Sequence, residues 1–468
     1  MGYRASNSPP YGKTQFELGL ASPLQLSSSL FVASRRPSIP LSLKLLHFPT
    51  SPTRRTASNG HIPAPIDRLP VEILCDIFSI CDETPGNQPC GSKVTLSHVC
   101  RRWRGVVLCM PVLWSRISVQ KPNQTSVERV TAHFRRSGSY PISLAIIETV
   151  SASLEQRDAI TCLLPMIRTH ASQIKSLCLR LRTSAGDFVT HLNGCQFPRL
   201  EALECSLHRC PKDLMKSLMT RLQQGSHLSS LVWSGAEDIP PNVSWHSLTR
   251  LELRGSYNLQ DVCNILGQCR DLQELILDSF KDSPVIDTSF FLPALRNLQV
   301  HSRVSLGPFF RCLHAPSLQT IFIHYRMDAD LSRDWDSFGV FLLRSSCDLR
   351  SFVLWDVRID DVQFAQCLEL PGLQSLTTID VRQPISDNIL RRITLSNSVD
   401  RVALLPRLES VTLSRCLTVD GLLQDFVSSR LAHGRLNSFK VGLGEGQSKD
   451  EIYLRSLKEA GRNIYAYR

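Results

Sequence analysis

Leu248-Thr249-Arg250-Leu251-Glu252-Leu253 is one copy of a short apolar pattern that recurs through most of this 468-residue chain. Each copy has an apolar residue, two others, a second apolar residue, one other, and a third apolar residue. Full copies occupy residues 174–179, 200–205, 228–233, 272–277, 295–300, 318–323, 349–354, 408–413 and 436–441, with a weaker copy at 373–376. Alternating apolar positions predict a short strand in each copy. Since no single unit can bury its apolar side alone, stacked units are expected to build a curved parallel sheet over one continuous core.

The spacing of the copies narrows the fold class to an irregular repeat. Their first positions lie about 20 to 35 residues apart, inside or near the 20–29-residue window of leucine-rich repeats. A TIM barrel or Rossmann array is disfavoured, because both need longer strand–helix units with glycine-rich phosphate loops. The copy at 408–413, with Cys416 and Asp420-Gly421-Leu422 after it, resembles the cysteine-containing leucine-rich repeat. That resemblance implies an α/β fold in which residues 120–468 form a leucine-rich-repeat-like solenoid, a horseshoe with a parallel sheet.

A different pattern precedes the repeats. Leu69-Pro-Val-Glu-Ile-Leu-Cys-Asp-Ile-Phe78 places apolar residues at helical spacing, with Asp67 as a candidate cap and Pro70 near the helix start, where proline is tolerated. Residues 96–107 repeat the helical period, with arginines mainly on the solvated side, and residues 113–119 alternate like a strand. Two or three short helices cannot bury much core alone. Their apolar stripe therefore needs the rest of the chain or another protein.

These two segments resemble the F-box motif over residues 65–119, and Pro111-Val-Leu-Trp-Ser115 looks like the version abundant in mushroom-forming fungi. The resemblance implies that an F-box module at residues 62–119 docks on Skp1, the adaptor of cullin-RING ubiquitin ligases. The linker of about 17 residues between Phe78 and Leu96 departs from the family pattern and leaves the docking geometry open. By the resemblance, the adaptor-binding candidates are Leu69, Pro70, Ile73, Leu74, Ile77, Phe78, Leu96, Val99 and Trp103.

Composition and charge limit the remaining classes of protein. The net charge is +11, but residues 1–60 hold 7 basic residues and one acidic residue, which leaves 46 basic and 41 acidic residues in the remainder. A nucleic-acid-binding surface is therefore not indicated. The same 60 residues are rich in serine and proline and are predicted to be a disordered tail. No apolar run is long enough to span a membrane. The 16 scattered cysteines indicate buried thiols in a reducing compartment, the cytoplasm or nucleus.

The sequence offers no catalytic constellation, so we expect no enzyme and no cofactor. Gly442-Leu-Gly444-Glu-Gly446 is interpreted as a turn, and Cys205, His208 and Cys210 as a poor zinc set, because strand alternation separates them. The arginine pairs at 101–102, 135–136 and 391–392 are interpreted as solvated, with a phosphate or acidic-peptide site as the alternative. Trp233, Tyr325 and Trp355 could anchor a ligand on the sheet or simply pack.

The combined expectation is a substrate-recognition subunit of a Skp1–cullin–F-box ubiquitin ligase, which binds a protein target through its repeats. The alternative is a leucine-rich-repeat scaffold whose helical module only caps the repeats and has no role in ubiquitin transfer.

Overall fold

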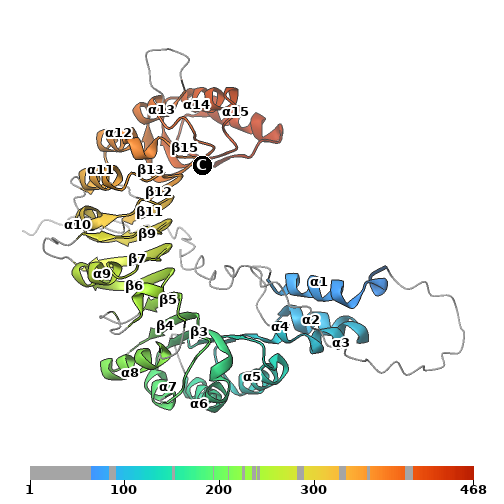
Figure 1. Ribbon diagram of the computed structural model, residues 1–468. Helices are drawn as coiled ribbons and strands as arrows, with labels where there is room; N and C mark the ends of the chain where they lie inside the picture. The colour runs from blue at the N-terminus through green and yellow to red at the C-terminus, as the bar shows by residue number, and fades with distance from the viewer. Residues whose placement is uncertain are drawn as a thin grey trace, which may run out of the picture. The chain divides into compact units, whose positions relative to one another are not determined.

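The computed structural model describes residues 65–83, 91–149, 153–192, 194–208, 210–223, 227–234, 239, 243–281, 289–325, 334–355, 359–395 and 404–467. The predicted disordered tail lies outside these residues. The chain divides into two compact units, residues 1–86 and 87–468. The first unit contributes a short 3₁₀ helix, η2 (Pro65–Arg68), and helix α1 (Val71–Glu83) (Figure 1).

Three short helices open the second unit: α2 (Gly91–Val99), α3 (Arg101–Cys109) and α4 (Pro111–Trp114). Pro111 occupies the first turn of α4, where its missing N–H costs no hydrogen bond. Leu113 and Trp114 consequently end a helix, and the strand predicted over 113–119 begins only at Arg116.

The second unit is built around a 14-stranded parallel sheet, so the predicted mixed α/β class is confirmed. Successive strands pair in chain order, and the described sheet is open, with β1 and β16 at its two edges. The strands are β1 (Arg116–Gln120), β2 (Ile142–Ile147), β3 (Ile174–Leu181), β4 (Ala202–Leu207), β5 (Ser230–Ser234), β6 (Arg250–Asn258), β7 (Glu274–Lys281), β9 (Asn297–Ser302), β11 (Thr320–Tyr325), β12 (Ser351–Trp355), β13 (Thr378–Ser386), β14 (Ser410–Leu417), β15 (Ser438–Leu443) and β16 (Ile464–Tyr467). Two shorter strands, β8 (Phe290–Phe291) and β10 (Leu313–His314), pair with each other.

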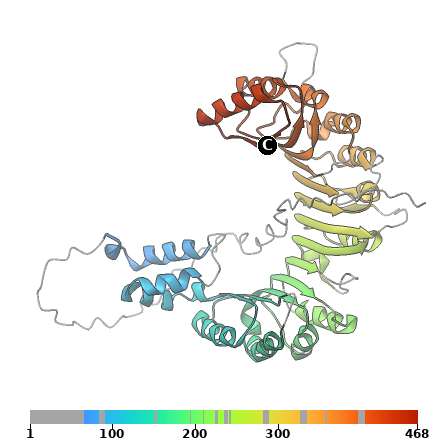
Figure 2. The same cartoon turned by 180° about the vertical axis from the view of Figure 1, so that it is seen from behind.

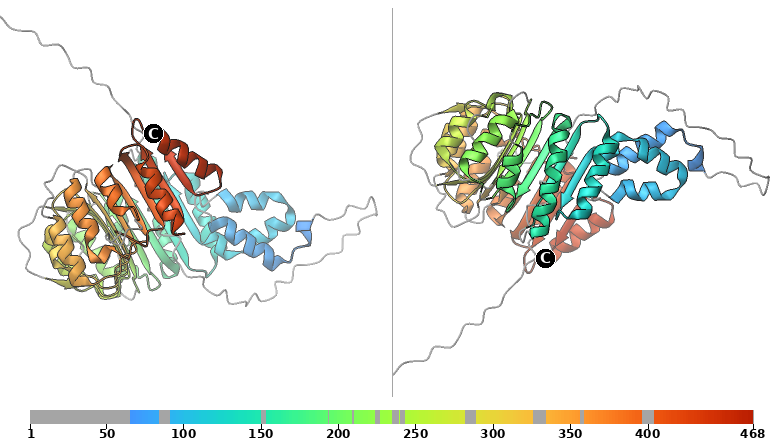
Figure 3. Two further views of the ribbon diagram at one scale, coloured as in Figure 1. Left: turned by 90° about the horizontal axis from the view of Figure 1, so that it is seen from above. Right: turned by 90° about the horizontal axis from the view of Figure 1, so that it is seen from below.

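Helices connect most of the strands. Within the second unit they lie along one face of the sheet and leave the other face open (Figures 1, 2 and 3). They are α5 (Gln124–Ser137), α6 (Leu154–Thr169), α7 (Ala185–His191), α8 (Lys212–Gln223), α9 (Leu259–Leu266), α10 (Gly307–Cys312), α11 (Asp334–Ser345), α12 (Asp361–Glu369), α13 (Asp387–Ile393), α14 (Leu422–Ala432) and α15 (Ser448–Glu459), with 3₁₀ turns η3 (Ala171–Gln173), η4 (Trp245–Ser247) and η5 (Pro371–Leu373).

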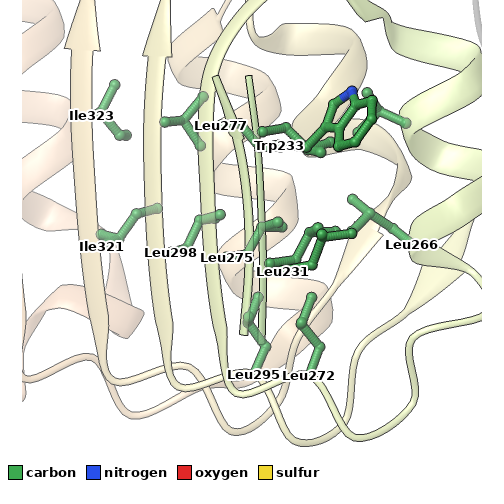
Figure 4. Close-up of a cluster of buried hydrophobic side chains, with 14 of the residues drawn as sticks. Leu231, Trp233, Leu266, Leu272, Leu275, Leu277, Leu295, Leu298, Ile321 and Ile323 are labelled. Atoms are coloured by element: carbon green, nitrogen blue, oxygen red, sulfur yellow. The ribbon is translucent and has the colours of Figure 1, made fainter. Parts of the chain in front are cut away.

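The apolar positions of the repeat form rows across the sheet. Leu251 lies opposite Leu231 on one side and Leu275 on the other, and the row continues through Leu298 and Ile321 (Figure 4). Every one of these side chains is at most 1% exposed. Burying a leucine or isoleucine side chain contributes roughly 1.5–3 kcal/mol. Leu266 from α9 faces the same rows, so strands and helices share one core (Figure 4).

The structure decides three details that the sequence left open or predicted wrongly. The weaker copy at 373–376 is not a strand, because Leu373 ends η5; the next strand, β13, uses Leu376-Thr-Thr-Ile379-Asp-Val381, a full copy of the pattern. Trp233 and Tyr325 are 1% and 8% exposed and belong to the core, so packing is the role that holds for both. Of the glycine run, Gly446 lies in a turn as predicted, whereas Gly442 lies inside β15, where a Cβ would sit 2.0 Å from the carbonyl oxygen of Ser414.

Candidate partner-binding surfaces

Helix α1 carries two apolar stripes. Leu74 and Phe78, four residues apart, are fully buried. Ile73 and Ile80, seven residues apart and therefore on one side of the helix, are 45% and 65% exposed. An apolar stripe left in water beside a buried one is unusual for a helix that only packs within its own chain, and such surface favours binding to another protein.

The six candidates of the first segment do not share one environment. Pro70 and Ile73 are exposed, Leu69 and Ile77 are half-buried, and Leu74 and Phe78 are buried. The burial of Leu74 and Phe78 indicates that both pack within the chain, and the other four residues remain candidates for contact with the adaptor. Ile80 was missed, although its position seven residues after Ile73 continues the same stripe.

The second segment lies in the second unit. Val99 is 57% exposed, and Leu96 and Trp103 are half-buried. Among the described residues, the continuous core of the sheet runs from Ile117 to Ile464 and includes none of the nine candidates.

Trp114 joins α2–α4 to the sheet. Its Nε1 donates a hydrogen bond of 2.8 Å to the carbonyl oxygen of Val107, and its own carbonyl oxygen lies 3.1 Å from Nδ1 of His133 on α5. The Arg136 guanidinium lies over the indole, 4.2 Å from the ring centroid. Beside it, the ammonium of Lys93, a residue 1% exposed, donates to the carbonyl oxygens of Leu113 (2.8 Å) and Arg116 (3.3 Å).

The electrostatics of this junction follow from burial. Desolvation, followed by the nearby charge of Lys93, lowers the pKa of His133 to about 3, so the imidazole is neutral at ordinary pH. A neutral ring can donate Nδ1–H to the carbonyl of Trp114 without adding a buried charge. The junction thus fixes α2–α4 to the first connecting helix of the sheet.

The open face of the sheet has two zones. Over β3–β7, arginines and glutamates alternate across strands: Arg180 and Arg254 contact Glu204 at 2.6 and 3.1 Å, and Arg254 contacts Glu252 at 2.5 Å. Arg250 pairs with Glu252 and Glu274. Because Glu204 and Glu252 are only 4% and 5% exposed, these pairs chiefly satisfy buried carboxylates.

The second zone, over β9–β13, is aromatic. Trp355 lies 4.8 Å from Phe322 and 5.3 Å from His324, measured between ring centroids. The exposed guanidinium of Arg382 lies over the indole of Trp355, 3.1 Å from the ring centroid. Trp355 is thus the one member of the predicted aromatic set that the structure places on the open face, half-buried.

The structure separates the residues that the sequence offered as a poor zinc set. Cys205 is buried in the core whereas His208 is exposed, and no cluster of three His, Cys, Asp or Glu residues there could hold a metal ion. None of the described cysteines forms a disulfide, and burial raises the pKa of the Cys263 thiol to about 12. No described helix is both long and apolar enough to cross a membrane.

Comparison with known proteins identifies one segment. Residues 66–120 match the F-box-like family, which covers α1 to α4 and strand β1. No curated protein matches the chain. The exposed stripe of α1 and the Trp114 junction therefore both belong to an F-box-like domain.

Proposed function

We propose that this protein is a substrate-recognition subunit of a Skp1–cullin–F-box ubiquitin ligase. Its F-box-like domain would bind the Skp1-type adaptor, and a leucine-rich-repeat-like solenoid over residues 120–468 would bind the protein target. The resemblance of residues 111–115 to the fungal version of the motif supports a fungal member of this class. Such a subunit performs no bond chemistry; it raises the effective concentration of a target near the ubiquitin carrier. A subunit of this kind is expected to act in the cytoplasm or the nucleus.

The observation that carries the proposal is the exposed apolar stripe of α1 inside the segment that matches the family. Ile73, Ile77 and Ile80 follow one another at helical spacing on α1, Leu69 and Pro70 directly precede the helix, and none of the five is buried. Apolar anchors that are desolvated on binding contribute most of the affinity of an interface.

The aromatic zone of the open face is the better candidate for target contact. The charged zone already pairs its own arginines and glutamates, so a partner would have to break these pairs. Trp355 and Arg382 offer an aromatic surface and an exposed cation, the residue types enriched where proteins bind.

Adaptor capture tests the first half of the proposal. The full chain is co-expressed with a Skp1-type adaptor, and the amount of adaptor co-purified is measured. Ile73→Asp with Ile80→Asp should abolish capture, because two carboxylates would be buried against an apolar partner. The double change Leu69→Ala with Pro70→Ala should do the same.

The matched control is Ile452→Asp on α15, which is 67% exposed and lies outside the F-box-like domain. It should leave capture unchanged. Equal capture by the wild type and by Ile73→Asp with Ile80→Asp would refute adaptor docking and favour the repeat scaffold without a ubiquitin role.

A further inference from the structure

A cavity of about 370 Å³ lies between helices α2, α3, α4 and α5 of the second unit. Its apolar lining includes Val94, Leu108 and Trp114, and three arginines stand around it: Arg104 on α3, and Arg129 and Arg136 on α5. It lies within one compact unit, and none of the nine adaptor-binding candidates lines it.

The apolar base of the cavity is held in place. Trp114 is 5% exposed and is fixed by its hydrogen bond to Val107 and by the covering guanidinium of Arg136. Leu108, by contrast, is 38% exposed and Val94 is 50% exposed, so apolar surface remains accessible at the cavity.

Arg104 and Arg129 have spare donors, and neither has an acidic partner among the residues that the structure describes. Arg104 uses Nε to donate to the Ser97 carbonyl oxygen at 2.9 Å, and Arg129 makes one long contact of 3.5 Å with Oγ of Ser126. Each guanidinium has five N–H donors. No residue lining the cavity is a carboxylate, and residues 84–136, which span the four helices around it, contain one acidic residue, Glu128, against nine Lys or Arg.

We propose that this cavity binds an acidic peptide segment of a partner protein, with an apolar side chain of the segment on Leu108 and Val94 and its carboxylates on Arg104 and Arg129. Charge complementarity sets the sign of the ligand, because uncompensated arginines favour carboxylates in paired, bidentate geometry. The apolar surface of the cavity favours a ligand that also carries an apolar side chain, because a small inorganic anion would leave that surface in water.

Nucleic acid fits the site less well. Single strands bind through bases that stack on aromatic rings. The indole of Trp114 is almost completely buried, Arg136 lies on its face, and the ring of His133 lies against it at 5.1 Å. The indole thus offers no open face to a base, and the exposed imidazole of His98 is the aromatic ring at the cavity that a base could reach.

The test measures fluorescence anisotropy of a labelled peptide of glutamates interrupted by two leucines, titrated with the full chain. Arg104→Gln with Arg129→Gln should weaken binding about tenfold or more, as expected for the loss of two charge-assisted contacts. The matched control, Arg101→Gln with Arg135→Gln, removes two exposed arginines from the same two helices outside the cavity. It should change affinity less than about twofold. A peptide with serines in place of the leucines should also bind more weakly than the parent.

Equal weakening by the two arginine pairs would overturn the proposal, because it would show attraction to net charge alone. Tighter binding of a single-stranded oligonucleotide than of the peptide, displacement by millimolar inorganic phosphate, or no saturable peptide binding would overturn it as well. A thermal melt checks folding of each variant. If the glutamine pair melts early, Arg104→Lys with Arg129→Lys replaces it and should still bind the peptide more weakly than the control pair.

Discussion

Apolar side chains at the repeat positions of the sheet are buried, whereas helix α1 leaves some side chains of the same types exposed. In the sheet, an apolar side chain at a repeat position meets an equivalent side chain on each neighbouring strand, and Leu251, Leu275 and Ile321 have no exposed surface. In α1, Leu74 and Phe78 are buried while Ile73 and Ile80 of the same helix are exposed. A repeat thus completes its own core through its neighbours, whereas the short helix leaves apolar surface exposed, as the proposed docking on an adaptor requires.

If the comparison is correct, changes inside the sheet should have the largest effect on stability. Phe352→Ala on β12 empties a fully buried site and should lower the free energy of unfolding by about 3–5 kcal/mol. Val353→Ala, the next residue, points to the open face and should cost far less. Chemical denaturation of both variants measures the difference. Similar losses would mean that the two faces of the sheet are not distinct.

The close approach of β14 and β15 gives the second test. Gly442→Ala would place a methyl group 2.0 Å from the Ser414 carbonyl oxygen, and this clash with backbone should cost about 2 kcal/mol or more. Gly186→Ala on α7 meets no atom within 4 Å and should be neutral or stabilising by up to about 1 kcal/mol. Thermal melts should therefore show a lower midpoint for Gly442→Ala and an unchanged or higher midpoint for Gly186→Ala; an unchanged midpoint for Gly442→Ala would contradict the packing described for β15.

The repeat pattern allowed the strands of the sheet to be predicted, but not which apolar residues of the chain stay exposed. The spacing of apolar residues predicted the parallel strands because each copy satisfies the same local rule. It placed one strand too early, at 373–376, because Leu373 and Leu376 mimic the pattern while the strand itself continues through Ile379 and Val381. Periodicity also cannot tell which apolar residues stay exposed: Ile73 and Leu74 are neighbours in the sequence, yet only the second is buried.

The cavity between α2–α4 and α5 could be predicted only in part. Arg136 belongs to one of the predicted arginine pairs, but Arg104 and Arg129 belong to none. That Arg104 and Arg129 face one cavity depends on how α3 packs beside α5, which no local pattern encodes. The Trp114 junction has the same origin, because Lys93 and His133 are 40 residues apart and meet only in the folded chain.

A buried carboxylate beside the sheet predicts pH-dependent stability. Glu148, after β2, is 5% exposed and accepts hydrogen bonds from the backbone N–H groups of Arg182 and Thr183 and from the hydroxyls of Thr183 and Ser184. Burial acts to raise the pKa of Glu148, but these bonds outweigh it and leave the pKa below the ordinary 4.5. The stabilisation is therefore complete above the unfolded-state value and is lost as pH falls through the folded-state value.

Glu148→Gln should consequently lower the free energy of unfolding by about 1–3 kcal/mol at pH 7. The gap between the variant and the wild type should shrink as the pH falls through the lowered folded-state pKa of Glu148, below which both side chains are uncharged. Urea denaturation at several pH values measures both. A gap that does not vary with pH would show that charge on Glu148 contributes nothing.

The smallest loss of stability among the destabilising changes is expected for an exposed apolar residue of α1. This result would distinguish the helix from the buried core of the sheet. Ile80→Ser changes a residue that is 65% exposed, and it should alter the free energy of unfolding by no more than about 0.5 kcal/mol. In the presence of a Skp1-type adaptor the same change should lower affinity, because the apolar contact is made only in the complex. Isothermal titration with the adaptor and denaturation of the free chain give the two numbers. A large loss of stability in the free chain would place Ile80 in this protein's own core, and the contrast between helix and sheet would then be wrong.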